Sequence, residues 1–486
     1  MNTDPPASGR IVLAGELMLD VLLAPAPHVR AGGGPATMAR ALSAAGREVT
    51  VLGKLGPDQN GRWIAAELAG AGVELPVAPA RSRATGYVVM RRQCDPAASP
   101  PPGEAAPGTI DRVVYVERGA NFLLAPADVE GRLVGRSWLH LSGYCLVDAD
   151  PAEAAFLLAG EARRAGIPIS LDPGVPWAFR GAGSEELLRL FRLGLPGGPD
   201  FFLPSGDMAA HLAGETAGSQ ATGRAARDLA GRFPRVVVKD GPAGAWVGGE
   251  RAPLGGGQAA AGADISGAGD VWNAAFIAAT LDGLFPLEAV ARANTQASRY
   301  VAGCLARTDA ASAGAALAGG AWRSLAWLKV ESGEAPLLVS ACLAGVASAY
   351  DGQARPAPAR GPWADSPTRR LGLPVCPEQL GGLPTPREPA EIPQGGGEGV
   401  MDGRGRVVDR AGRDVTVAFR KGADRVVELA RAVGASLAVL KEGSPSCGVG
   451  RIHDGRFRGR QGPGRGVTAA ALRQAGVRVT SEEDWT

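Results

Sequence analysis

The sequence Asp-Ile-Ser-Gly-Ala-Gly-Asp spans residues 264–270, and the apolar stretch Val-Trp-Asn-Ala-Ala-Phe-Ile-Ala-Ala-Thr-Leu follows it directly at 271–281. Glycines placed just before a helix let consecutive backbone N–H groups point at one anion, and the helix dipole also favours negative charge there. The carboxylate of Asp270, at the end of this turn, could accept a proton from an attacking hydroxyl. The stretch therefore predicts an anion hole beside a general base, which phosphoryl transfer requires, although the same turn could serve as a simple helix cap.

Short strand-like runs alternate with helical patterns along most of the chain. The apolar run at 11–23 is typical of a buried strand region, and 35–46 has the spacing of an amphipathic helix. Such alternation predicts a largely parallel, doubly wound α/β sheet. A Pro-rich segment separates two further strand-like runs, 86–93 and 112–119, which together predict an exposed hairpin with a floppy tip.

The region from residue 10 to 325 resembles the PfkB, or ribokinase-like, sugar and nucleoside kinases, because a series of motifs recurs in the order of that family. They are GELMLD with Asp20, GGGPATMARAL with Gly32 to Gly34, LGKLGPDQNG with Gly56, Asp58 and Gly61, RGAN at Arg118 to Asn121, LDP with Asp172, VVKDGPAGA with Lys239 and Gly241, the stretch 264–270, and RANTQAS with Asn294. This resemblance implies a ribokinase-like α/β domain with a small β lid. It also implies ATP and Mg²⁺ as cofactors and a sugar or nucleoside as substrate. A homodimer through the kinase domain is a further possibility.

The same resemblance assigns roles to ten residues. Asp270 would be the catalytic base, and the remaining roles would be the anion hole (Gly267, Ala268, Gly269), the acceptor hydroxyl site (Asp20, Gly33, Gly34) and the nucleotide pocket (Lys239, Gly241, Asn294).

Three motifs depart from the family pattern. Thr37 replaces a common Asn at the substrate turn, and Gly174 replaces the Asn of an Asp-Pro-Asn turn. Ser205 and Met208 replace the Asn and Glu that organise Mg²⁺ and phosphate, so that Asp207 is the remaining carboxylate of that turn. Because a hard cation needs oxygen ligands, these changes leave two alternatives open, an active kinase and a kinase-like binding scaffold.

A second, smaller α/β unit is predicted for residues 335–486, after a short linker at 326–334. Cys342, Cys376 and Cys447 each follow an apolar strand pattern in a Gly/Pro/Ser-rich turn, where site residues are usually presented. Their wide spacing excludes a zinc-finger pair, but three thiolates from separate loops suit either zinc or an iron–sulfur cluster. His453 could complete a Cys₃His zinc site, which is the main chemical alternative.

This unit resembles a family whose characterised members are 2-thiouracil desulfurases. The matching motifs are SACLAG, the YDG at Tyr350 to Gly352, VCPEQLGGLPTPREPAEI, GRDVTVAF, VLKEGSPSCG, IHDGRF and GRGVTAAALRQAGVRV. The resemblance implies a 4Fe-4S cluster held by the three cysteines and a thiolated base as substrate. It also implies an acid/base role for Glu378 and a substrate contact for Ser444, with Gly443 replacing a polar residue of the signature. Arg387 and Lys441 are either anchors for substrate oxygens or plain surface charges.

Composition restricts the remaining functional classes. The chain has 486 residues with a formal net charge of +2, no apolar run of the roughly 18 residues that span a bilayer, and no signal-peptide pattern at its start. These features predict a cytoplasmic protein with small-molecule substrates and no duplex nucleic acid partner. Three functions stay open: a bifunctional kinase and desulfurase, a desulfurase with a degenerate kinase-like domain, and a sugar kinase carrying a zinc-stabilised, non-catalytic module.

Overall fold

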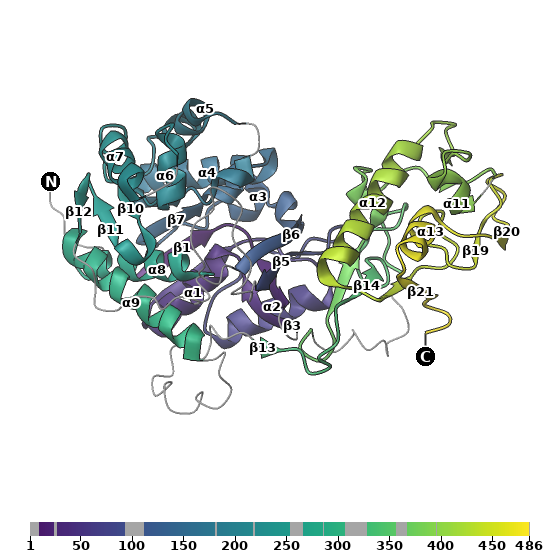
Figure 1. The fold of residues 1–486 in the computed structure, drawn as a ribbon. Coiled ribbons are helices and arrows are strands. Elements are labelled where there is room, and N and C mark those ends of the chain that lie inside the picture. Colours follow the sequence, from purple (N-terminus) through teal and green to yellow (C-terminus); the bar gives the residue numbers. More distant parts are fainter. Residues whose placement is uncertain are drawn as a thin grey trace.

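The computed structural model of the chain describes residues 9–23, 27–92, 111–179, 182–216, 219–252, 266–284, 286–306, 328–355, 367–394 and 396–485. The tip of the predicted hairpin, between 93 and 110, lies outside these residues. Two α/β domains lie side by side, with the N-terminal domain in purple to teal and the C-terminal domain in green to yellow (Figure 1).

The N-terminal domain is built on a parallel sheet whose strands follow the order β4-β1-β7-β8-β9. Along β1, Ile11 and Leu13 pack into one hydrophobic cluster, whereas Val12 and Ala14 pack into another. Side chains of a strand alternate between its two faces, so helices cover both faces of this sheet, as a doubly wound fold requires. The strands are β1 (Arg10–Ala14), β4 (Glu48–Leu52), β7 (Trp138–Ser142), β8 (Ile169–Asp172) and β9 (Phe201–Phe202), and a second small sheet contains β10 (Val237–Lys239), β11 (Ala245–Val247) and β12 (Glu250–Arg251).

Nine α-helices of this domain fall within the described residues. They are α1 (Gly34–Ala44), α2 (Gln59–Gly70), α3 (Pro126–Val129), α4 (Ala149–Ala165), α5 (Ser184–Arg189), α6 (Gly206–Leu212), α7 (Ser219–Ala230), α8 (Ala268–Leu281) and α9 (Pro286–Ala306).

A separate five-stranded sheet forms the predicted lid, in the order β13-β3-β2-β5-β6. β5 and β6 pair antiparallel, which confirms the predicted hairpin, and Leu328 of β13 pairs with Val29 of β3. The predicted linker therefore contributes an edge strand to the lid instead of a plain connection. The strands are β2 (Met18–Leu23), β3 (Pro27–Gly32), β5 (Thr85–Arg92), β6 (Asp111–Gly119) and β13 (Leu328–Lys329).

The C-terminal domain has a parallel sheet in the order β15-β14-β18-β21. The amphipathic helix α12 packs its buried residues, including Phe419 and Val426, into the hydrophobic core beside this sheet. The elements are β14 (Leu337–Ser340), β15 (Gly372–Val375), β16 (Ala390–Glu391), β17 (Val408–Asp409), β18 (Leu437–Leu440), β19 (Arg451–His453), β20 (Gln461–Pro463), β21 (Arg478–Ser481), α10 (Pro377–Leu380), α11 (Gly396–Met401), α12 (Thr416–Val433) and α13 (Val467–Gln474).

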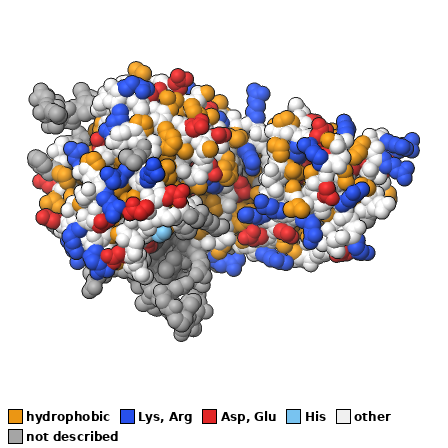
Figure 2. Space-filling model, turned by 90° about the horizontal axis from the view of Figure 1, so that it is seen from above, with side chains coloured by type: hydrophobic (Ala, Val, Ile, Leu, Met, Phe, Trp, Pro, Cys, Tyr) orange, Lys and Arg blue, Asp and Glu red, His pale blue; other side chains and the backbone are white. Residues whose placement is uncertain are grey.

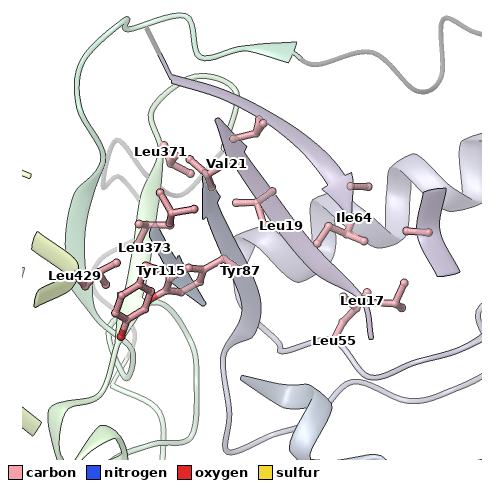
Figure 3. Close-up of a cluster of buried hydrophobic side chains, with 14 of the residues drawn as sticks. Leu17, Leu19, Val21, Leu55, Ile64, Tyr87, Tyr115, Leu371, Leu373 and Leu429 are labelled. Carbon is pink, nitrogen blue, oxygen red and sulfur yellow. The ribbon is translucent and has the colours of Figure 1, made fainter. Parts of the chain in front are cut away.

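The outer face of the lid sheet packs against the C-terminal domain. Tyr87 and Tyr115 of the lid stack at 6.2 Å between ring centroids, and the same buried cluster continues into Leu373 and Leu429 of the C-terminal domain (Figure 3). Because this cluster is continuous, the two domains share one hydrophobic core where they meet.

Hydrogen bonds reinforce this contact. The Gln379 side-chain amide donates to the Ser82 carbonyl at 2.6 Å, and the Arg91 guanidinium donates to the Ala432 carbonyl at 3.0 Å. Gln379 lies in α10, directly after Glu378, so the interface reaches the neighbourhood of the predicted desulfurase residues.

The surface carries both signs of charge over both domains, with a group of Lys and Arg side chains at the free end of the C-terminal domain (Figure 2). Among the described residues, no helix combines the length and the apolar character needed to cross a bilayer. The cytoplasmic location stays a prediction.

Candidate functional sites

A cavity of about 660 Å³ lies between the central sheet and the inner face of the lid sheet. Side chains alternate between the two faces of the lid strands. Met18, Asp20 and Val88 point into the cavity, whereas Leu19 and Tyr87 point to the opposite face. All ten residues predicted for the kinase site line this one cavity: Asp20, Gly33, Gly34, Lys239, Gly241, Gly267, Ala268, Gly269, Asp270 and Asn294.

Asp270 lies in the first turn of α8, directly after the predicted anion hole. Gly267 caps the helix in the left-handed region at φ 82°, a conformation that glycine adopts without strain. A Cβ atom on Gly34 would lie 2.9 Å from Oδ1 of Asp270, so the carboxyl group rests against the predicted substrate turn. Burial, and after it the charge of Asp172, raise the pKa of Asp270 to about 7, against the lowering effect of Lys239 and Arg30. A base with this pKa is well matched to proton transfer near neutral pH.

Lys239 lies in the cavity beside the predicted anion-hole turn. Its ammonium donates to Oδ2 of Asp172 at 2.6 Å and to Oδ1 of Asn273 at 3.1 Å. A Cβ atom on Gly269 would lie 3.8 Å from its Nζ. Burial alone would raise the pKa of Asp172, but the Lys239 ammonium, together with hydrogen bonds from Gly174 and Asn273, outweighs burial and lowers that pKa. Lys239 therefore adds a fixed positive charge beside the anion-hole turn.

The three predicted ligand cysteines follow three neighbouring parallel strands. Cys376 comes directly after β15, Cys342 lies two residues beyond β14, and Cys447 lies in the loop after β18. Since the carboxyl ends of adjacent parallel strands meet at one edge, these thiols share one end of the sheet. All three are free cysteines.

Burial raises the pKa of each of these thiols, that of Cys342 to about 12. The charge of Cys376 raises the pKa of both Cys342 and Cys447, which places the three thiols within electrostatic reach of one another. In the described part of the chain, no three His, Cys, Asp or Glu side chains are grouped closely enough to hold a metal ion. The ligand role of the three cysteines therefore stays a prediction.

Glu378 and Arg387 form a pair beside Cys376. Nε of Arg387 lies 2.6 Å from Oε2 of Glu378, and their side chains are 7% and 13% exposed. Arg387 also donates to the Ser348 carbonyl at 3.1 Å, which accepts from the Cys376 thiol across 3.7 Å. The alternative of a plain surface charge is therefore wrong for Arg387, whose charge is directed at Glu378.

Ser444 shapes the loop that carries Cys447. Its hydroxyl oxygen accepts hydrogen bonds from the backbone N–H groups of Ser446 at 3.1 Å and Cys447 at 3.0 Å. Lys441 pairs with Glu482 outside the group of cysteines. Nδ1 of His453 lies 3.9 Å from Oε1 of Glu391 and has no hydrogen-bond partner among the described residues. The predicted substrate contact of Ser444 stays a prediction.

Sequence comparison assigns the larger domain to a family. A profile of the pfkB family of carbohydrate kinases matches residues 15–89 and 108–309, more than half of the chain. The chain belongs to the pfkB carbohydrate kinase family. A second profile, that of 2-thiouracil desulfurase, matches residues 337–484, so the chain is a fusion of a pfkB domain and a domain of this second kind.

Individual relatives match one domain each. The uncharacterized protein YbbK of Bacillus subtilis (strain 168) is 44% identical over 153 residues, which are 30% of this chain and 96% of that protein. The solved [4Fe-4S]-dependent thiouracil desulfidase TudS is 44% identical, with coverage of 31% of this chain and 92% of that chain and a TM-score of 0.27. The adenosine kinase from Sinorhizobium meliloti is 19% identical, with coverage of 60% and 94% and a TM-score of 0.52, which shows the fold. The chain spans little more than half the length of the plant fructokinases that it also matches.

Two of the residues that depart from the family pattern stabilise the fold of the pfkB domain. Ser205 caps α6 by accepting a hydrogen bond from the Met208 N–H at 3.3 Å, and the Met208 side chain is fully buried. Asp207 is exposed and does not line the cavity, so it is no substitute for the missing carboxylate.

Arg30 is a residue of the pfkB domain site that the motifs did not reveal. Its Nε lies 2.9 Å from Oδ2 of Asp20, which places a buried cation against the carboxylate predicted to hold acceptor hydroxyls. The two residues face each other across the β2–β3 pair, so recognition of this hairpin register would have brought them together.

The pKa of Asp270 leads to a prediction for the pfkB domain. Below about pH 7 the carboxyl holds its proton and cannot accept one from a hydroxyl. We therefore expect kcat/KM for phosphoryl transfer to fall about tenfold per pH unit on the acid side of this pKa. Steady-state rates across the pH range, with circular dichroism to verify that the protein stays folded, would check this. A rate that does not change down to about pH 5 would contradict it.

Proposed function

We propose that the chain is bifunctional: the pfkB domain transfers a phosphoryl group from ATP to a sugar or nucleoside hydroxyl, and the C-terminal domain removes sulfur from a thiolated pyrimidine or a related compound. The observation that carries the kinase half is the position of the Asp270 carboxyl, which lies against the substrate turn at Gly34 and directly after the anion-hole turn, in one cavity.

Three groups of the pfkB domain divide the work of phosphoryl transfer. Asp270 accepts the proton of the acceptor hydroxyl as its oxygen bonds to the γ-phosphorus and the bond from phosphorus to ADP breaks. The N–H groups at the start of α8 and the Lys239 ammonium stabilise the negative charge that develops on the phosphoryl oxygens. We propose that Mg²⁺ enters with the nucleotide phosphates, because the Ser205 and Met208 positions are occupied by a helix cap and a core side chain.

The donor set of the C-terminal domain fits an iron–sulfur cluster. Three soft thiolates at one sheet edge, Cys342, Cys376 and Cys447, would hold a 4Fe-4S cluster and leave one iron without a protein ligand. Such a cluster, when bound, would supply a soft Lewis acid for the sulfur of a thiocarbonyl group. His453 is the alternative fourth ligand, but its ring faces Glu391.

Glu378 is the proton carrier in this proposal. Arg387, 2.6 Å away, holds the Glu378 carboxylate in place, and this carboxylate can take a proton from the water that attacks the thiocarbonyl carbon. The reaction exchanges C=S for C=O, with water as the oxygen donor and sulfide as the leaving group. No electron acceptor is required.

Anaerobic purification followed by iron, zinc and acid-labile sulfide analysis tests the desulfurase half, and sulfide release from 2-thiouracil measures its activity. Roughly four irons and four sulfides per chain are expected for one cluster. Stoichiometric zinc without sulfide would contradict the proposal. For the kinase half, ADP release is measured with a panel of sugars and nucleosides, and a panel without turnover would contradict it.

Glu378→Gln should keep the cluster and lose most of the activity. Gln has nearly the same shape but cannot carry a proton, so sulfide release should fall by about 10²- to 10⁴-fold while the brown colour stays. Glu398→Gln is a matched control, because Glu398 forms a partly exposed pair with Arg465 in the same domain. Full sulfide release by Glu378→Gln would remove this residue from the mechanism.

We further propose that the protein is cytoplasmic and forms a homodimer. Since the outer face of the lid sheet is already covered by the C-terminal domain, a homodimer formed through the kinase domain would have to use another surface of that domain.

A further inference from the structure

Arg30 lies on the cavity side of the lid, directly opposite Asp20 in the β2–β3 register. Its side chain is 2% exposed, and its Nε pairs with Oδ2 of Asp20 at 2.9 Å. A charge buried to this extent must be fully hydrogen-bonded. The acceptors of its remaining N–H groups therefore show what else the guanidinium holds in place.

The Arg30 side chain extends from the lid to the turn before α8. Nη1 donates to the Ser266 carbonyl at 3.3 Å and to the Tyr300 hydroxyl at 2.8 Å, and Nη2 donates to Oγ of Ser266 at 3.0 Å. The Tyr300 hydroxyl itself donates to the Ser266 carbonyl at 2.7 Å. Two donors from different elements, β3 and α9, therefore fix one carbonyl.

That carbonyl belongs to the first peptide of the anion-hole turn. A peptide group is planar and trans, so its N–H points opposite to its C=O. With the Ser266 carbonyl bound to Arg30 and Tyr300, the Gly267 N–H is directed away from both of them. The guanidinium also lies against this glycine, because a Cβ atom on Gly267 would be 3.5 Å from Nη2 of Arg30.

We propose that Arg30 is a positioning residue of phosphoryl transfer, which orients the Ser266–Gly267 peptide from the lid and so links closure of the lid to assembly of the anion hole. This inference rests on the proposed kinase function. It also changes the role of Asp20, whose carboxylate orients Arg30 in addition to any hydroxyl that it binds.

Three variants separate this role from charge alone and from stability alone. Arg30→Met removes both the charge and the hydrogen bonds. Arg30→Lys keeps the charge, but a single ammonium lacks the planar, forked guanidinium and cannot hold Asp20 and Ser266 together in the same way. Arg232→Met is the matched control, because Arg232 forms surface pairs with Glu185 and Asp228 away from the cavity.

We expect Arg30→Met and Arg30→Lys both to lower kcat by about 10²-fold, the effect of a misplaced catalytic group, with little change in the KM for ATP. Asp270 faces Asp20 from β2, Arg30 from β3, Asp172 from β8 and Lys239 from β10. Arg30→Met removes one of the two cations in this set, so the acid limb of its pH profile should shift to higher pH, whereas that of Arg30→Lys should not. Arg232→Met should match the wild type.

Amide hydrogen exchange gives a readout that does not need turnover. In the nucleotide-free chain, the amides of 267–270 should exchange about tenfold faster in Arg30→Met than in the wild type or Arg232→Met. Wild-type exchange at these amides together with wild-type kcat would overturn the proposal, as would a loss of thermal stability with unchanged kcat per folded molecule. If the wild-type protein phosphorylates nothing, the kinase proposal fails, and exchange alone decides whether Arg30 holds this turn.

Discussion

Cys447→Ala should yield a colourless protein that releases no sulfide from 2-thiouracil, even when it is purified without oxygen. Cys447 is 6% exposed and lies in a loop held by the Ser444 hydroxyl. Loss of one thiolate removes both a negative charge and a fixed corner of the cluster cage. Iron and acid-labile sulfide analysis, together with the visible absorption spectrum, measures the loss.

A matched control for this variant is Cys145→Ala, because Cys145 is a buried cysteine of the pfkB domain at 2% exposure. That protein should stay brown and keep its iron. If Cys447→Ala retained a full cluster, Cys447 would not be a ligand. Loss of metal on His453→Ala, without sulfide in the wild type, would support a zinc site instead.

Asp270→Asn should lower the kcat for phosphoryl transfer by about 10²- to 10⁴-fold, the usual cost of losing a general base. Asn occupies the same space against Gly34 but cannot accept the proton of an attacking hydroxyl. Binding of ATP, measured by calorimetry, should persist, because the anion-hole N–H groups and Lys239 are unchanged.

Asp207→Asn is the control for this variant, because it makes the same change from carboxylate to amide at an exposed position outside the cavity. It should turn over at the wild-type rate. An Asp270→Asn protein with wild-type kcat would exclude Asp270 as the base and return the anion-hole turn to the alternative of a simple helix cap.

Much of the fold could be predicted from local sequence patterns. The turn at 264–270 and the alternation of apolar runs indicated a doubly wound sheet, and β1 indeed sends Ile11 and Val12 into different cores. The ten kinase residues line one cavity, and they lie in strands β2 and β10, in helices α1, α8 and α9, and in the turns beside these elements. Each motif of this kind is a short stretch of sequence, so it can be recognised without knowledge of the three-dimensional fold.

Long-range pairings could not be predicted in the same way. Arg30 contacts Ser266 across a separation of 236 residues, and Arg91 contacts Ala432 across a separation of 341 residues. A charged residue in a sequence carries no sign of its partner, because the partner depends on how separate elements pack. The edge strand β13 was missed for a related reason, since two residues give no periodic pattern.

The covered outer face of the lid sheet has a consequence for synthesis of the protein. Tyr87 and Tyr115 leave the ribosome long before Leu373 and Leu429, which lie against them in the finished chain (Figure 3). Until the C-terminal domain has been made and folded, this apolar face of the nascent kinase domain is exposed to water and to other chains. In the finished chain, the C-terminal domain keeps this apolar face away from water.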